Sequence, residues 1–304
     1  MKNMKRNILL MVLGFMPLQV KAEAVAQVLG LGAGARAAGM GEAFSSVAND
    51  ASAIYWNPAG TLLVRSASIV LMHAAYFDST SYDYAAFVKS NQKRAFGASV
   101  QYLSYGDIQK TDNTTTSIGS FTPNDLVATV SLSQQLPFIS LGVSGKYIQS
   151  KIIDSASTFA GDIGLLTKRY GNNKIRHALT VSNLGGTLKF DSVSEDLPII
   201  YRFGNALYIK ESWVLSVDGI RNEDKNVIAF GTEIIQTASN GWRMMGRAGY
   251  NTQYKDAGSG AGLSFGLGIG INSFNINYAF APFGDLGDSH KFAIGWDFGK
   301  YVRS

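Results

Sequence analysis

The sequence predicts an all-β fold: a transmembrane antiparallel β-barrel of about 14 strands, preceded by a hatch or plug segment that contains a short helix. Three observations support this prediction. The chain begins like an exported protein, the region after residue 65 alternates between apolar and small or polar residues, and long and short connections follow one another. After residue 22 no stretch is apolar over the roughly 20 residues that a transmembrane helix requires.

The first residues have the composition of a secretory signal peptide. Lys2, Lys5 and Arg6 precede an apolar run, and small residues end it near Ala22. A single-pass anchor is the alternative, but the run is interrupted by Pro17 and is shorter than the roughly 20 residues that cross a bilayer. We therefore expect cleavage after Ala22. The expected division is 1–22 as signal peptide, 23–65 as hatch inside the barrel and 66–304 as transmembrane barrel.

Charge and cysteine content exclude several function classes. Four of the 27 Lys and Arg residues and none of the 22 Asp and Glu residues precede residue 23, which leaves 27 − 4 = 23 basic against 22 acidic residues. The mature chain is nearly neutral, so nucleic acid is not an expected partner. Because the chain has no cysteine, disulfides, thiolate metal sites and cysteine nucleophiles are excluded.

The barrel strands are predicted from alternation with a period of two. The clearest case lies near the C-terminus, where Phe292, Ile294 and Trp296 alternate with Ala293 and Gly295. One face of such a strand suits lipid and the other a crowded lumen. The segments near residues 85 and 204 alternate most weakly. About fourteen such segments are predicted, centred near residues 70, 85, 100, 130, 143, 163, 179, 204, 217, 231, 246, 265, 277 and 295.

The connections predict the orientation of the barrel. Long or polar linkers follow the first, third and every later odd-numbered segment, and the longest cover residues 106–123 and 185–198. Tight links such as Leu136-Pro137 and Asn272-Ser273 lie between them. A bacterial barrel has long extracellular loops and short periplasmic turns. We therefore expect both termini in the periplasm and the protein in the outer membrane.

Residues 25–65 do not alternate and are rich in glycine and alanine. A short helical stretch is predicted over residues 50–55, with Asn49 or Asp50 as its cap and Pro58 as its stop. The segment is too long for a turn and too poor in apolar side chains to face lipid. We therefore expect it to fill the barrel lumen as a plug.

Two motifs in this segment carry a family resemblance: GAGARAAGMGEAF over residues 32–44 and VANDASAIYWNPAG over residues 47–60. They resemble the N-terminal signature of the PorV/PorQ family, which belongs with the FadL-like barrels. Asn57-Pro58-Ala59 also resembles an element in the hatch of the fatty-acid transporter FadL. The resemblance implies a fourteen-stranded barrel with an N-terminal hatch, in agreement with the count above.

The resemblance implies two alternative functions. PorV-like proteins take part in type IX secretion and hold or shuttle exported proteins at the outer membrane, whereas FadL-like relatives pass hydrophobic small molecules. The inward positions are mostly Gly, Ser, Ala, Thr and Asn, which favours a plugged scaffold, while the modest loop lengths favour a transporter. The chain departs from other outer-membrane barrels in lacking a terminal aromatic residue, and Phe298 or Tyr301 is expected to supply that assembly signal.

The candidate site is the hatch motif, with either a structural or a gating role. Asn57 and Pro58 would form a hatch kink that opens a path, or a helix stop whose amide satisfies freed backbone groups, and the second reading is favoured. Arg36 is expected to pair with Asp50, Asp162, Asp218 or Glu233 and so to anchor the plug. The candidate residues are Arg36, Gly39, Gly41, Asn49, Asp50, Trp56, Asn57, Pro58 and Gly60.

Catalysis, metal binding and cofactor binding are not expected. His73, His177 and His290 lie on separate predicted strands without a metal-ligand spacing. The glycines of residues 258–270 are not a phosphate loop, because no βαβ unit surrounds them, and small residues facing a crowded lumen explain them. The expected partners are the outer-membrane bilayer and either exported proteins with secretion components or a hydrophobic ligand.

Overall fold

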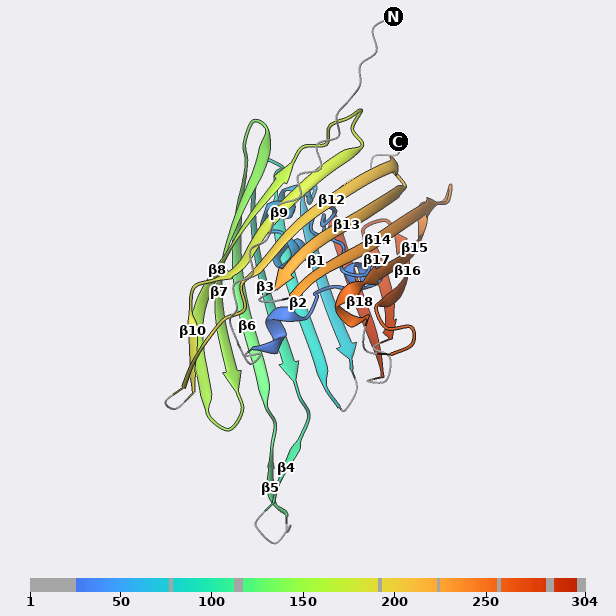
Figure 1. Ribbon diagram of the computed structural model, residues 1–304. Coiled ribbons are helices and arrows are strands. Elements are labelled where there is room, and N and C mark those ends of the chain that lie inside the picture. The colour runs from blue at the N-terminus through green and yellow to red at the C-terminus, as the bar shows by residue number, and fades with distance from the viewer. Residues whose placement is uncertain are drawn as a thin grey trace, which may run out of the picture.

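The protein forms a closed β-barrel around its N-terminal segment, in a computed structural model that describes residues 26–76, 79–111, 117–190, 193–222, 225–255, 258–282 and 287–299 (Figure 1). The predicted signal peptide over residues 1–22 and Tyr301 lie outside the described residues. Every barrel strand is antiparallel to its neighbours, and β1 pairs with β18 from Ala67↔Phe298 to Ala75↔His290, which closes the cylinder. Closure leaves no sheet edge in the membrane.

The fourteen predicted strands are confirmed. The barrel consists of β1 (Ala67–Ala75), β2 (Ser81–Ser90), β3 (Arg94–Ser104), β6 (Asn124–Gln135), β7 (Ile139–Lys151), β8 (Ser155–Thr167), β9 (Ile175–Leu184), β12 (Ile200–Lys210), β13 (Trp213–Asn222), β14 (Lys225–Thr237), β15 (Trp242–Asn251), β16 (Leu263–Ile271), β17 (Phe274–Pro282) and β18 (Asp288–Phe298). Two hairpins outside the barrel are formed by β4 (Ile108–Thr111) with β5 (Ser117–Phe121) and by β10 (Thr187–Phe190) with β11 (Val193–Asp196).

The two ends of the barrel differ in their connections. The turn end is where the chain enters β1 and leaves β18, and the loop end is the opposite one; the β4–β5 hairpin projects from the loop end well beyond the barrel (Figure 1). The predicted sorting of connection lengths is only partly correct. Residues 152–154 form a short loop-end connection, because β7 and β8 each extend to 13 residues there, and residues 168–174 form a longer connection at the turn end.

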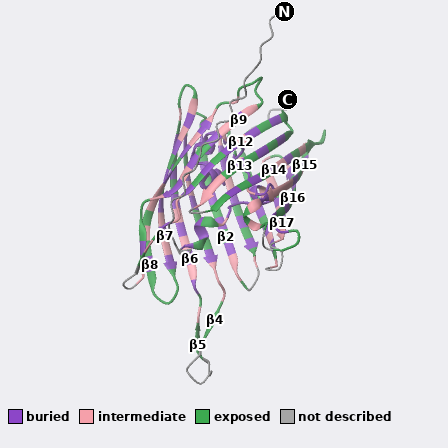
Figure 2. Cartoon of the chain, viewed as in Figure 1, coloured by how far each residue is buried: buried purple, intermediate pink, exposed green. Residues whose placement is uncertain are grey.

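Burial follows the predicted alternation along the strands (Figure 2). On β16 the outward Phe265 and Leu267 are exposed, whereas Gly266 between them is buried. The segment near residue 85 alternates weakly in sequence for a physical reason. On β2 the large inward residues Tyr82 and Tyr84 are buried inside the barrel, whereas the outward residues include Asp83 and Lys89, so the usual contrast of apolar outward and small or polar inward residues is lost.

Short helical turns precede the barrel: η1 (Gln27–Gly30), α1 (Ala35–Ala38), α2 (Ala53–Trp56) and η2 (Pro58–Leu63). The helix predicted over residues 50–55 is shifted, because Asp50 accepts hydrogen bonds from Ser52 and forms a turn before the helix. Pro58 also does more than stop the helix, since it begins η2 with Asn57 as the N-cap. Among the described residues, no helix combines the length and the apolar character needed to cross a membrane.

Candidate functional site

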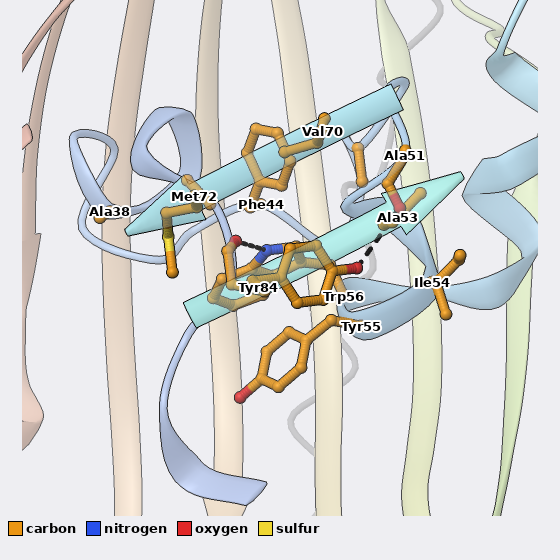
Figure 3. Close-up of a cluster of buried hydrophobic side chains, with 14 of the residues drawn as sticks. Ala38, Phe44, Ala51, Ala53, Ile54, Tyr55, Trp56, Val70, Met72 and Tyr84 are labelled. Carbon is orange, nitrogen blue, oxygen red and sulfur yellow. Dashed lines mark hydrogen bonds between the residues drawn. The ribbon is translucent and has the colours of Figure 1, made fainter. Parts of the chain in front are cut away.

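The hatch, whose described part is residues 26–65, lies against the inner wall of the barrel and contributes several of the largest fully buried side chains, among them Trp56 and Phe44. Trp56 is fully buried and its ring meets Phe44 at 6.0 Å between centroids and Tyr55 at 4.9 Å (Figure 3). The Trp56 indole N–H donates to the carbonyl of Ala33 over 2.7 Å, and Tyr84 of β2 donates to the carbonyl of Ala51 (Figure 3). These contacts hold the hatch to itself and to the wall.

Close approach of the hatch depends on inward-facing glycines of the barrel. A Cβ atom added at Gly249 would lie 2.1 Å from the backbone nitrogen of Gly41, and one at Gly142 would lie 2.3 Å from the backbone nitrogen of Ala59. Any side chain at these positions would displace the hatch. Glycines that contact the hatch in this way, with a Cβ position no more than 3.0 Å from a hatch atom, occur on seven strands: Gly97, Gly142, Gly164, Gly204, Gly231, Gly249 and Gly266.

Arg36, whose side chain is partly buried, connects the hatch to β14 by an ion pair with the buried Glu233. Its Nε donates to Glu233 Oε1 over 2.8 Å and its Nη2 to Glu233 Oε2 over 2.7 Å, while Nη1 lies 3.2 Å from Asp50 Oδ2. Arg247 of β15 donates to the same Glu233 carboxylate over 2.8 Å. The pairing predicted for Arg36 is therefore confirmed for two of the four candidate carboxylates.

The carboxylates around Arg36 stabilise the protonated form of its guanidinium. Burial alone would lower the pKa of its guanidinium, but the carboxylates of Glu233 and Asp50 and the hydrogen bonds to them raise that pKa above its ordinary value. Asn49 adds a further acceptor through its side-chain oxygen. Arg36 is thus a permanent cation with acceptors on both the hatch and the barrel.

The other two candidate carboxylates hold different groups. Asp218 of β13 accepts from the backbone nitrogens of Phe44 and Ser45 over 3.3 and 3.0 Å, and so fixes the hatch by its main chain. Asp162 of β8 pairs with Lys146 of β7 over 2.9 Å. This pair lies where the register between β8 and β9 shifts, away from Arg36. Arg36 contacts neither of these two carboxylates, and Asp218 lies 3.9 Å from Arg202 instead.

Asn57 satisfies backbone groups on both sides of the hatch kink. Its Oδ1 accepts from the nitrogen of Ala59 over 3.0 Å, and its Nδ2 donates to the carbonyls of Leu165 on β8 and Ser45 in the hatch. The carbonyl of Pro58 accepts from Ser133 of β6 over 2.7 Å. Asn57 and Pro58 therefore lie where the hatch meets β6 and β8, and their gating role stays a prediction.

The remaining candidate residues also lie in the hatch. Gly41 has φ +62°, a conformation that glycine adopts readily, and its nitrogen donates to Ser264 of β16 over 2.9 Å. Gly39 packs on Gly266, and a Cβ at Gly60 would lie 2.7 Å from the carbonyl oxygen of Ala48. The structure thus brings all the candidate residues into one plug. Their roles stay predictions.

A cavity of about 1450 Å³ lies at the turn end beside the hatch. Its lining combines apolar side chains with many charged and amide ones, so it is not the predominantly apolar lining expected of a path for an apolar solute. The sequence alone did not predict this charged lining. Arg243 and Arg247 lie four positions apart on β15 and therefore on the same face of the strand, which was a usable signal for inward-facing charges. The lining includes Arg36, Asp50, Glu233, Arg243, Arg247, Asn275, Asn277 and Asp297.

The three histidines lie on separate strands, β1, β9 and β18. His73 pairs with Asp83 over 2.7 Å, His177 contacts Tyr170 and Asn205, and His290 contacts Tyr278 over 2.9 Å. Within the described part of the chain, no group of three or more His, Cys, Asp or Glu side chains is placed to hold a metal ion.

Comparison with known proteins gives one family and one fold. The family model described as "Type IX secretion system protein PorV" matches residues 19–213. No curated protein matches the chain in sequence.

Three solved structures show the similarity of fold. The toluene transporter TbuX of Ralstonia pickettii has 13% identity and a TM-score of 0.58, covering 88% of this chain and 99% of its own. The toluene transporter TodX of Pseudomonas putida has 13% identity and a TM-score of 0.59, covering 87% and 96%. A FadL homologue of Pseudomonas aeruginosa has 12% identity and a TM-score of 0.53, covering 86% and 98%. At these identities the likeness establishes a FadL-like barrel fold.

Proposed function

This chain belongs to the PorV family of type IX secretion system proteins, and on that premise we propose that it is a plugged scaffold that holds or shuttles exported proteins at the outer membrane. It is an outer-membrane β-barrel, and its family is not a family of enzymes. We propose that it has no catalytic step of its own. The division into a signal peptide, a hatch to residue 65 and a barrel from residue 66 is part of the same proposal.

The observation that carries the proposal is the way the hatch is held. Opening a path through the lumen would separate Arg36 from Glu233 and leave buried charges unpaired, which costs several kcal/mol. It would also break the main-chain contacts that Gly142 and Gly249 make with the hatch. A barrel closed in this way acts through its outer surfaces and loops.

The β4–β5 hairpin is the part of the loop end best suited to a protein partner. It projects from the barrel (Figure 1), and Ile108 and Ile118 expose 45% and 64% of their surface. Among the described strands, β4 and β5 pair only with each other, so their outer edges are free to accept an extended segment of a partner. The second predicted loop, residues 185–198, is a weaker candidate, because its Leu188 and Leu197 are buried.

The matched test replaces exposed isoleucines on two loops of the same end. Ile108→Ser with Ile118→Ser alters the hairpin, and Ile152→Ser with Ile153→Ser alters the connection between β7 and β8, where both isoleucines are also exposed. The barrel is extracted gently from its own outer membrane, and the exported proteins that copurify are quantified by mass spectrometry. The proposal predicts loss of these proteins with the hairpin variant alone. Equal recovery with both variants would contradict the docking role of the hairpin.

Transport of a hydrophobic small molecule is the second candidate. It is supported by an apolar group in the loop-end half of the lumen, where Tyr82, Leu103, Val127 and Ile148 are buried, and by the fold shared with the toluene transporters. These side chains pack against one another and the hatch, and the cavity at the turn end is lined by charged and amide side chains as well as apolar ones. The scaffold role is therefore the better supported of the two.

A further inference from the structure

The outer wall formed by β1, β2, β3, β6, β7 and β8 contains a shallow apolar furrow of about 820 Å³. Its floor is made of small outward residues on adjacent strands, and a Cβ atom added at Gly145 would meet no other atom within 4 Å. Bulky outward residues form its sides. The floor comprises Ala85, Ala98, Ala128 and Gly145, and the sides include Leu71, Phe87, Val100, Val130 and Phe159.

Three cations lie on the turn-end side of the furrow, Lys89 one outward position beyond its lining and Arg94 two. Lys89 is the next outward residue after Phe87 on β2, and Arg94 is the next one before Phe96 on β3, so each lies about 7 Å along its strand from an apolar neighbour. Lys93 lies in the turn between these strands, and all three side chains are exposed. The Nε of Arg94 donates to Gln134 of β6 over 3.0 Å.

Lys89, Lys93 and Arg94 have no acidic residue in the chain segments around them. The chain segments that meet there, residues 65–67, 89–94 and 134–138, contain no Asp or Glu. At the other end of the furrow the outward residues of β1 and β2 are polar. His73 of β1 and Asp83 of β2 lie opposite each other there and pair over 2.7 Å. The furrow is therefore bounded by cations toward the turn end and by a polar pair toward the loop end.

The opposite wall lacks both features. On β16 the outward residues Leu263, Phe265, Leu267 and Ile269 are all bulky and exposed. The neighbouring turns, residues 238–241 and 272–273, carry no charge. The combination of a furrow with a cationic end is thus a local feature of one wall and not a general property of the lipid-facing surface.

We propose that the furrow and its three cations bind an anionic phospholipid of the inner leaflet of the outer membrane. One acyl chain lies over the small residues of the furrow, and the headgroup phosphate accepts hydrogen bonds from Lys89, Lys93 and Arg94. The geometry fits because the turn end of a bacterial barrel faces the periplasm. Lysine side chains also bury their stems along apolar surface while the ammonium group stays at the headgroups. This role is additional to the secretion function and does not depend on it.

The test reconstitutes the whole barrel in vesicles of phosphatidylethanolamine and phosphatidylglycerol in equal amounts. Lipids that remain bound after mild detergent extraction are counted by native mass spectrometry. The triple variant Lys89→Gln, Lys93→Gln, Arg94→Gln is expected to lower the preference for phosphatidylglycerol at least about tenfold, because each basic residue near an anionic surface contributes about fivefold. The control Lys151→Gln with Lys225→Gln, at the loop end, is expected to keep the preference.

A second pair of variants tests the furrow separately from the charges. Gly145→Leu fills the furrow, whereas Gly246→Leu adds the same side chain to an outward glycine of β15 whose Cβ position is equally open. Retention of either lipid should fall with Gly145→Leu and stay unchanged with Gly246→Leu. Unaltered lipid selectivity in the triple variant, or equal retention in the two leucine variants, would overturn the proposal.

Discussion

Arg36 and Glu233, separated by 197 positions in the sequence, join the hatch to the barrel wall through two parallel hydrogen bonds of 2.8 and 2.7 Å. Such a two-point contact fixes both the position and the orientation of the guanidinium. Because Arg247 also donates to Glu233, one carboxylate balances cations from two segments. We therefore expect the attachment of the hatch to the wall to depend strongly on Glu233.

Replacing Glu233 by Gln should destabilise the barrel strongly. The substitution keeps the shape of the side chain but leaves the buried Arg247 and the partly buried Arg36 with less compensation, and breaking a buried pair in this way costs about 3–5 kcal/mol. Urea unfolding of the barrel in lipid vesicles, followed by tryptophan fluorescence, measures the change in unfolding free energy.

The matched control for that experiment is Glu211→Gln. Glu211 pairs with Arg169 over 2.7 Å, but its side chain is 66% exposed, and exposed ion pairs contribute about 0–1 kcal/mol. Similar losses for Glu211→Gln and Glu233→Gln would argue against Arg36–Glu233 as the anchor of the hatch.

Two glycines of the same strand, on opposite faces, test the packing of the hatch. Gly142→Ala on β7 places a methyl group 2.3 Å from the backbone nitrogen of Ala59, whereas Gly145→Ala on the outer face meets nothing within 4 Å. Overpacking should make the first variant less stable by about 1–3 kcal/mol. Limited proteolysis from the periplasmic side should cut the hatch faster in Gly142→Ala. The same rate in both variants would mean that the hatch does not press on β7.

Asn57→Asp separates the structural role of the kink from a gating role. The new carboxylate keeps the acceptor for Ala59 but replaces the donor to the carbonyls of Ser45 and Leu165. Loss of these bonds should cost about 1–3 kcal/mol of unfolding free energy. A structural role predicts this loss without any gain in uptake of a hydrophobic dye by vesicles that contain the barrel. Unchanged stability with faster uptake would support gating.

The strands could be predicted from the sequence because the membrane imposes the alternation directly. Outward residues such as Phe292 and Ile294 must be apolar, and the inward ones between them are small. The prediction was weakest near residue 85, where the hatch supplies an apolar lining and removes the contrast between the two faces. Tyr82 and Tyr84 are the residues responsible.

The arrangement of the hatch could be predicted only in part. The composition of residues 25–65 indicated a plug, and Arg36 called for a buried carboxylate, but four acids were equally plausible without a register between hatch and barrel. The contacts of Gly142 with Ala59 and of Gly249 with Gly41 are long-range. Nothing local to either glycine distinguishes a residue under the hatch from one that faces open lumen.

The most direct test of the scaffold role is native mass spectrometry of the barrel extracted gently from its own outer membrane, recording both protein and small-molecule adducts. The account predicts an exported protein bound in stoichiometric amount and, apart from phospholipid, no apolar ligand. A barrel that carries a fatty acid or another apolar solute and no protein partner would contradict the account and indicate a transporter.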